Sequence, residues 1–346
     1  MKHWIRFILV WMVTLQTGAQ QYEFNDAIRL SGFGTYSLSR SDSEVPVFTY
    51  RDIDDEWCAD CDSTLGLQLD WVINDQFRSS IQVVKRPQDD YSDPELEWAY
   101  LAYTRGNSTL KLGRLRIPMF LLSEYYYVSA AYPWIRPPHD IYDSFSGVTH
   151  YNGAAYEWQF WPTEQLQLKI SPYIAAAEEN DYQFFGKPFT LDSDGAYGLT
   201  VDLLQDDHQL HLSYLSVNSD QKQNGNTVYH YDMDMLSVGF SYLYQDYNIA
   251  LETLYDSGLF ADWYIGISRD LGNWLPYVQY GQLRGHANQT YLLGLRYPLT
   301  PRLVINAEWE YIRSPRVPLS GHFTQVQTAP IENDSHIFTL ALSFTF

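Results

Sequence analysis

The chain has 346 residues, and 42 acidic against 22 basic side chains give it a formal net charge of -20 at pH 7. This acidity argues against nucleic acid as a partner, because phosphate contacts require clustered lysine and arginine. The mean hydropathy of -0.32 is that of a soluble protein, and beyond the first residues no run is apolar enough for a membrane-spanning helix.

Residues 1–19 have the pattern of a secretory signal peptide. The first six residues include two basic ones, Phe7 to Leu15 form an apolar core of about nine residues, and Thr17 to Ala19 are small enough for cleavage. The alternative, a single membrane anchor, needs roughly 20 apolar residues. We therefore expect an exported protein with a signal peptide over 1–19 and one mature domain over 20–346, since no linker or solenoid repeat divides the rest.

Alternation of apolar with polar residues follows this segment and predicts β-strands. Ile28 to Leu38 carry apolar or small residues at most even positions, Leu65 to Ile73 carry apolar residues at odd positions, and residues 77 to 86 continue the odd pattern after a tight turn. Residues 39 to 63, between the first two strands, form a long acidic loop.

The next two expected strands are less regular. Apolar residues at even positions from Leu96 to Ala102 mark one face of the fourth strand. The fifth strand runs from Thr109 to about Arg116, and its apolar residues lie at even positions before Gly113 and at odd positions after it. An isolated glycine at such a phase change predicts a β-bulge.

The remaining segments repeat the alternation at the length that a tilted membrane strand requires. They lie at about 151–160, 165–175, 195–204, 208–217, 232–244, 247–256, 260–270, 274–284, 289–299, 302–313 and 335–346. Short links alternate with links that are mostly longer and more polar, as in barrels with tight periplasmic turns and larger outer loops. The tally is about sixteen strands with both termini on the periplasmic side; fourteen or eighteen would change only the width.

The last segment, Ser335 to Phe346, carries the most specific signal. Its even positions from Phe338 onward are apolar and its odd positions are mostly small or polar. A strand between lipid and a watery lumen has this signature, although a soluble sandwich would bury the same face. An alternating final strand with a C-terminal phenylalanine resembles the closing strand of bacterial outer-membrane porins, whose end the insertion machinery reads. The 16% aromatic content fits the aromatic girdles of such barrels, although a tyrosine-rich soluble β-protein would share it.

The predicted fold class is therefore all-β: a transmembrane antiparallel β-barrel of about sixteen strands. The connection from Ile117 to Gly147 is too apolar and aromatic to remain in water, so it must pack against something. The resemblance to porins implies that this third extracellular loop folds into the barrel and narrows it. It implies Glu124, Arg136, His139 and Asp140 as constriction candidates, opposite Arg29, Arg78, Arg86 and Lys111 on the wall. The loop lacks the short acidic, glycine-rich motif of enterobacterial porins, and it could instead cap the barrel or cover a neighbouring subunit.

The alternation also predicts which charges face the lumen. Acids and bases are mixed there: Asp70, Glu97, Glu157, Asp202, Glu252, Glu308 and Glu310 with Arg29, Arg78, Arg86, Lys111, Lys169 and Arg296. The excess acid lies in loops such as 52–56, and carboxylates near a pore mouth favour cations. We expect a weak cation preference. The same loops could hold Ca²⁺ or Mg²⁺ that bridges to anionic lipid, but a solvated acidic face is the simpler interpretation.

The two cysteines, Cys58 and Cys61, lie in the first acidic loop. Export to an oxidising compartment makes them a candidate disulfide, with inert thiols or no role as alternatives. A structural zinc site needs four ligands and this pair offers two, so no metal site is expected.

No enzyme motif is present, because neither a Gly-x-Ser-x-Gly elbow nor a His-Glu-x-x-His helix occurs. We expect no catalytic residues and no cofactor. The expected function is an outer-membrane channel for passive diffusion of small hydrophilic solutes and ions, in contact with outer-membrane lipid and lipopolysaccharide, and a homotrimer as the resemblance implies. A substrate-specific channel for sugars or small organic acids, and a plugged barrel that serves as a binding or adhesion scaffold, remain alternatives.

Overall fold

A computed structural model describes residues 22–25, 27–48, 51–87, 93–145, 148–184, 187–256, 261–285, 287–314, 322–324 and 333–346. The expected signal peptide over 1–19 lies outside these ranges. None of the helices in the described ranges has the length and apolarity needed to cross a bilayer.

Nearly all the regular structure is β. The strands are β1 Tyr22–Asn25, β2 Ile28–Ser41, β3 Thr64–Val72, β4 Phe77–Lys85, β5 Glu95–Arg105, β6 Ser108–Arg116, β7 His150–Phe160, β8 Leu166–Ala175, β9 Glu178–Phe184, β10 Lys187–Gln205, β11 His208–Gln223, β12 Asn226–Tyr244, β13 Tyr247–Asp256, β14 Asp262–Arg269, β15 Leu275–Leu283, β16 Asn288–Thr300, β17 Leu303–Arg313 and β18 Asp334–Thr345. The helices are short: 3₁₀ turns η2 Ser123–Tyr125, η3 Ser129–Ala131 and η4 Asp143–Phe145, and α2 His139–Tyr142.

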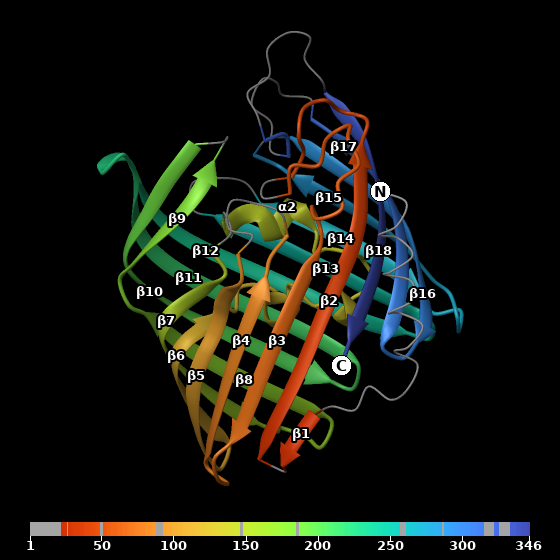
Figure 1. Cartoon of the computed structure of the whole chain (residues 1–346). Helices are drawn as coiled ribbons and strands as arrows, with labels where there is room; N and C mark the ends of the chain where they lie inside the picture. Colours follow the sequence, from red (N-terminus) through yellow and green to blue (C-terminus); the bar gives the residue numbers. More distant parts are fainter. Residues whose placement is uncertain are drawn as a thin grey trace.

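Sixteen of the described strands form one closed antiparallel ring (Figure 1). Each of β2 to β7 pairs with the strand that follows it, β8 pairs with β10, and β10 to β18 pair in sequence. The pairing of β18 with β2 closes the ring. The short strands β1 and β9 add to it, against β2 and β10. The predicted barrel and its strand number are confirmed.

The alternation in sequence becomes an alternation of outward and inward side chains. On β3, Leu65, Leu67 and Leu69 are exposed on the outer face of the ring. On β18, Phe338 and Leu340 are more than half exposed. Ile337 on the other face is fully buried, packed against β17 and against the first loop, residues 42–63 between β2 and β3. Burial is therefore inverted relative to a soluble sandwich, because the apolar side chains face away from the protein interior.

The phase change that we expected in the fifth strand lies instead in the fourth. Gln82 pairs with Trp98 but Val83 pairs with Leu96, so Glu97 is the extra residue of a bulge in β5. The bulge turns the next even positions, beginning with Trp98, toward the lumen. The expected bulge at Gly113 was wrong, because pairing runs unbroken through that residue to both β5 and β7.

Leu115 misled the prediction for this strand because it faces inward. Its side chain is buried against apolar residues of the connection that follows β6. Periodicity alone cannot distinguish a leucine that faces inward and is covered by a connection from a leucine that faces outward after a bulge. The inward position of Leu115 was therefore read as a phase change.

Strands β9 to β12 extend further than the alternation predicted. β10 and β12 each have 19 residues, and in Figure 1 the green strands β9 and β10 rise beyond the ring on the left. The sequence analysis missed β9 and these extensions because their residues, such as Glu178 to Asp181, are polar on both faces. Beyond the apolar band both faces of a strand meet water, so no period of two remains.

The seam between β2 and β18 depends on two glycines. The Gly32 N–H donates to the Phe346 carbonyl at 3.0 Å, and the Phe346 N–H donates to the Gly32 carbonyl at 2.9 Å. A Cβ on Gly34 would lie 2.6 Å from the Phe344 ring, so that ring occupies the space a larger residue would need. The rings of Phe344 and Phe346 thus pack directly against the backbone of Gly34 and Gly32.

We expect Gly34→Val to loosen this seam, because the new side chain must displace the Phe344 ring. Overpacking of this kind costs about 1–3 kcal/mol. The thermal midpoint of the detergent-solubilised protein should fall, as measured by loss of β-sheet circular dichroism. The control is Gly106→Asn, at a turn where a Cβ would meet nothing within 4 Å and where the φ of +58° is one that asparagine can adopt. An unchanged midpoint for Gly34→Val would contradict the seam argument.

Candidate functional site

The connection between β6 and β7, residues 117–149, is here called the inner segment. Its backbone is bound by carboxylates from strands far around the ring from β6. The Leu121 N–H donates to Glu252 Oε1 on β13 at 2.7 Å, and the Ile135 N–H donates to Glu308 Oε1 on β17 at 2.7 Å. Both glutamates are buried, and their strands contribute them to the inner wall. The inner segment therefore lies against the inner wall opposite the strands from which it starts.

Aromatic packing holds the same segment. Trp134 lies edge-on to Tyr264 and Tyr277 with ring centroids 6.1 and 6.4 Å apart. A Cβ on Gly266 would lie 2.8 Å from the Trp134 ring, so that glycine on β14 makes room for it. The apolar composition of the segment is explained by this contact with the wall.

Arg136 is the main charged anchor of the inner segment. Its guanidinium donates to Asp62 Oδ2 at 2.6 Å and to Glu310 Oε2 at 2.8 Å, and Arg51 Nε donates to the other Asp62 oxygen at 2.7 Å. Burial alone would raise the pKa of the Asp62 carboxyl, but Arg136 and Arg51 hold it below its ordinary value. The first loop and the inner segment thus share one buried ion network with β17.

A second cluster joins three connections. The His139 ring on α2 stacks on Phe48 of the first loop, with centroids 3.5 Å apart, and its Nδ1 lies 2.7 Å from Asp143 Oδ2. Asp140 lies 3.3 Å from Nε2 of His322, which belongs to the connection between β17 and β18. In Figure 1, α2 is drawn within the upper half of the ring, consistent with its contacts to β13, β14 and β15.

The two histidines of this cluster titrate in opposite directions. Burial lowers the pKa of His139 below its ordinary value of 6.5, and the Asp143 carboxylate only partly opposes this. Burial would also lower the pKa of His322, but Asp140 and Asp143 outweigh it and raise that pKa. His139 is therefore held neutral near pH 7, whereas His322 favours its proton.

The space left open is a cavity of about 520 Å³ between the inner segment and the wall formed by β3 to β8, β10 and β11. Residues 118–125 of the segment form one side of it. On the wall, Lys111 pairs with Glu157, and Lys169 Nζ lies 3.2 Å from Asp202 Oδ2. The barrel therefore retains a cavity lined by charged and aromatic side chains on one side and is filled by the inner segment on the other.

The eight constriction candidates separate into three groups. Glu124, Arg78 and Lys111 share the lining of the cavity. Arg136, His139 and Asp140 lie in the buried networks that fix the inner segment. Two wall arginines lie away from the cavity lining: Arg29 forms a 3.5 Å ion pair with Asp70, and Arg86 is buried against Glu97 at 3.0 Å.

Several site residues escaped the sequence analysis. Asp62, Arg51, Phe48 and His322 anchor the inner segment, but their loops show no periodicity that could have revealed it. By contrast, the period of two placed Glu252 and Glu308 in the lumen, and only their role as backbone acceptors was missed.

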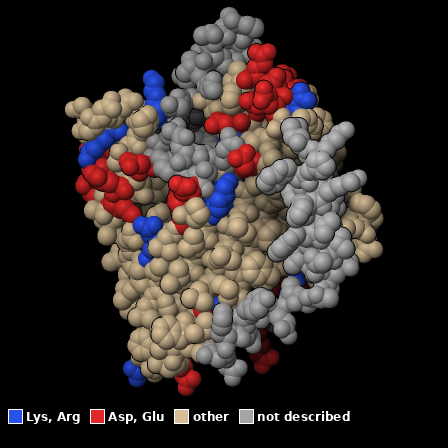
Figure 2. All heavy atoms as spheres, in the orientation of Figure 1, with Lys and Arg blue, Asp and Glu red and all other residues tan. Residues whose placement is uncertain are grey.

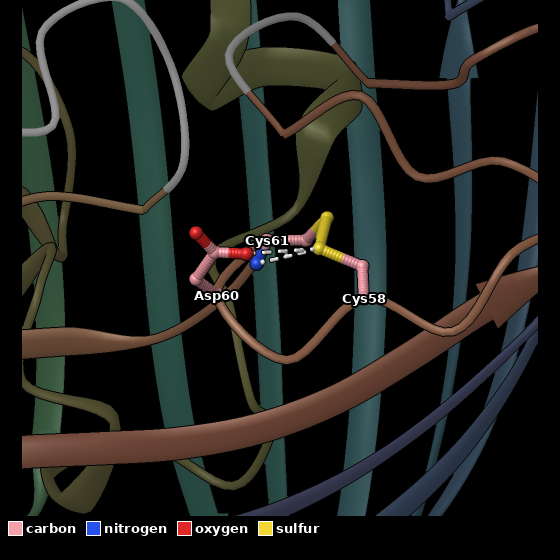
Figure 3. A group of neighbouring side chains, drawn as sticks. All are labelled: Cys58, Asp60 and Cys61. Carbon is pink, nitrogen blue, oxygen red and sulfur yellow. Dashed lines mark hydrogen bonds between the residues drawn. A yellow bond between two sulfur atoms is a disulfide. The ribbon is translucent and has the colours of Figure 1, made fainter.

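Cys58 and Cys61 form a disulfide in the first loop (Figure 3). Asp60 lies beside them, and the three residues are the only group in the described part of the chain close enough together to hold a metal ion. Metal binding by cysteine requires thiolates, and both sulfur atoms are committed to each other here. The donor set does not fit a metal.

No model of a known protein family matches the chain, and no curated protein is similar to it in sequence. Among solved structures, the fold is similar to an anion-selective porin from Comamonas acidovorans, with a TM-score of 0.63 and 12% identity over 92% of this chain and 99% of that one. A variant of the Rh. blastica porin gives 0.59 and 13% over 92% and 100%. A loop-deletion mutant of OmpT, an outer membrane protein of Vibrio cholerae, gives 0.53 and 14% over 93% and 100%. The resemblance read from the sequence is confirmed as a porin fold.

We expect Arg136→Met to detach the inner segment. The change leaves the Asp62 and Glu310 carboxylates buried without their shared cation, which costs about 3–5 kcal/mol. Amide hydrogen exchange in residues 117–145 should accelerate, as measured by mass spectrometry of the solubilised protein. The control is Arg29→Met, whose exposed pair with Asp70 is worth about 0–1 kcal/mol. Equal protection in the two variants would contradict the anchoring role.

Acid should also weaken the anchoring. Because the folded pKa of His139 lies below 6.5, its contribution to stability is complete above pH 6.5 and is lost as the pH falls toward the folded value. His322 has the opposite sign: its contribution is present below 6.5 and is lost as the pH rises through its raised pKa. In His139→Gln, exchange in the inner segment, corrected for intrinsic rates, should accelerate less between pH 7 and 5 than in the wild type. An equal acceleration of exchange between pH 7 and 5 in the variant and in the wild type would show that His139 does not contribute to the acid dependence.

Proposed function

We propose that the chain is an outer-membrane porin, which allows small hydrophilic solutes and ions to diffuse passively through its barrel with a weak preference for cations. The observation that carries the proposal is the polar cavity of about 520 Å³ inside a closed barrel whose outer face is apolar. An apolar outer band suits lipid, and a closed ring leaves no unpaired edge in it. In this proposal the inner segment acts as the constriction and residues 1–19 are removed on export.

The solved structures with this fold support the proposal, since those named above are porins or an outer membrane protein. Ring size supports it too, because barrels of sixteen to eighteen strands are wide enough for an aqueous channel. A homotrimer in contact with lipopolysaccharide is part of the proposal, resting on the family resemblance. It predicts an oligomer in native gels of the unheated protein.

The cation preference rests on where the acidic side chains lie. Inside the cavity, ion pairs neutralise most charges. Figure 2 shows Asp and Glu gathered at the upper end, the end of the long connections, where Asp55, Glu56 and Glu179 are exposed. Acidic rims raise the local cation concentration, and salt screens this effect beyond about 10 Å at 0.1 M. The preference should therefore be weak and should decrease with salt.

One further function is favoured by a specific observation. The networks around Arg136 and His139 fill one side of the lumen, as a plugged barrel serving as a binding scaffold would require. Conductance distinguishes the two, because a plug shows no open steps.

In a planar bilayer we expect stable steps of open-channel conductance. Under a salt gradient, the reversal potential should have the sign that a higher permeability for cations than for anions produces. Changing Asp55 and Glu56 to their amides should move the reversal potential toward zero by removing rim charge. The matched control changes Asp206 and Asp207 to Asn, in a turn at the opposite end of the barrel. A reversal potential of the sign that chloride permeation produces would reject the cation preference. An absence of conductance steps would reject the channel.

A further inference from the structure

Most charges that line the cavity are neutralised by a neighbour. Lys111 pairs with Glu157 across β6 and β7, and Asp202 is shared by Lys169 and by His211, whose Nδ1 lies 2.7 Å from Oδ1. Arg116 is held by Glu97 of the β5 bulge. These side chains present little net charge to a passing solute.

Two lining charges differ. Arg78 on β4 and Glu124 on η2 are both exposed, and within the described ranges neither side chain has a hydrogen bond or an ion pair shorter than 4 Å. Glu124 acts electrostatically on Lys169, but that ammonium is already committed to Asp202. One free cation thus belongs to the wall and one free anion to the inner segment.

Aromatic side chains line the same cavity. Trp98, Tyr100, Tyr151 and Tyr173 line the wall, and Tyr125, half exposed, follows Glu124 on the segment. Trp98 Nε1 donates to Ser80 at 3.0 Å, and the Tyr151 and Tyr173 rings lie 5.4 Å apart, so these rings are held in place. Such faces accept apolar and aromatic groups without imposing a charge.

We propose that this passage selects zwitterions with separated ends, namely amino acids and short peptides, over neutral and singly charged solutes of equal size. The carboxylate binds Arg78, whose guanidinium can hold it through two parallel hydrogen bonds, and the ammonium binds Glu124. A singly charged solute gains one of these contacts and is repelled by the other group. The inference rests on the proposed channel function and names its substrate class.

The contacts must be weak for transport, because a solute has to enter and also leave. Both groups are exposed to water, which screens the attraction. The cavity volume of about 520 Å³ lies within the range of about 300–1,000 Å³ for small-ligand sites, so it can hold a dipeptide.

The test is swelling of proteoliposomes in isosmotic solutes matched in size. The probes are alanyl-alanine, its N-acetylated anion, its amide cation and a neutral sugar. Wild-type protein should admit the zwitterion roughly fivefold faster than any of the others, a difference of about 1 kcal/mol. In Arg78→Gln the zwitterion should enter no faster than the amide cation, because both then bind only Glu124. In Glu124→Gln the zwitterion should enter no faster than the N-acetylated anion, because both then bind only Arg78. Arg105→Gln, at an exposed turn away from the cavity, is the control.

The exchanged pair, Arg78→Glu with Glu124→Arg, guards against simple misfolding. It should recover the zwitterion advantage, because the two ends of the peptide can bind in reverse. Equal rates for all four probes in wild type, a faster sugar, or an advantage that survives both single substitutions would overturn the inference while leaving the channel intact. If no probe enters and no current flows, the proposed channel function fails as well.

Discussion

Closure of the sheet between β2 and β18 is the constraint on which the rest of the structure depends. A strand in an apolar environment cannot leave backbone N–H and C=O groups unpaired, so every edge must meet another edge. The last residue takes part in that closure through its two hydrogen bonds with Gly32. Once the ring is closed, alternation places most apolar groups outside and the charged groups of the strands inside, apart from the bulge in β5 and inward residues such as Leu115.

The inward charges then have two uses. On the side of β13 to β18, buried carboxylates such as Glu252 and Glu308 accept backbone N–H groups and fix the inner segment. On the side of β3 to β8, β10 and β11, carboxylates and ammonium groups neutralise each other around an open cavity. The same alternating pattern thus produces one side that is filled, where Trp134 packs against Tyr264 and Tyr277, and one side that keeps an open cavity.

The sequence predicted the ring well because period two is a local property. It placed β13, β17 and β18 within a residue of their observed bounds and turned Glu252 and Glu308 inward. It failed where a second layer covers the wall, as at Leu115, and where both faces are wet, as in β9. The partners of Arg136 could not be predicted, since Asp62 lies 74 residues away in a loop without a repeating pattern. Glu124 and Arg78 were named, but only the structure shows that they share a cavity while Arg29 does not.

The buried network has a consequence for how this protein can evolve. Phe48, Asp62, His139 and His322 come from three separate connections and touch one another or the same partners. A substitution at one of these contacts requires a compensating substitution in another connection. The three connections are therefore expected to co-vary in sequence. The hairpin tip at Asn224 and Gly225 carries no such obligation: the positive φ of both residues favours asparagine and glycine there, but a change in the length of this tip needs no answering change in another connection.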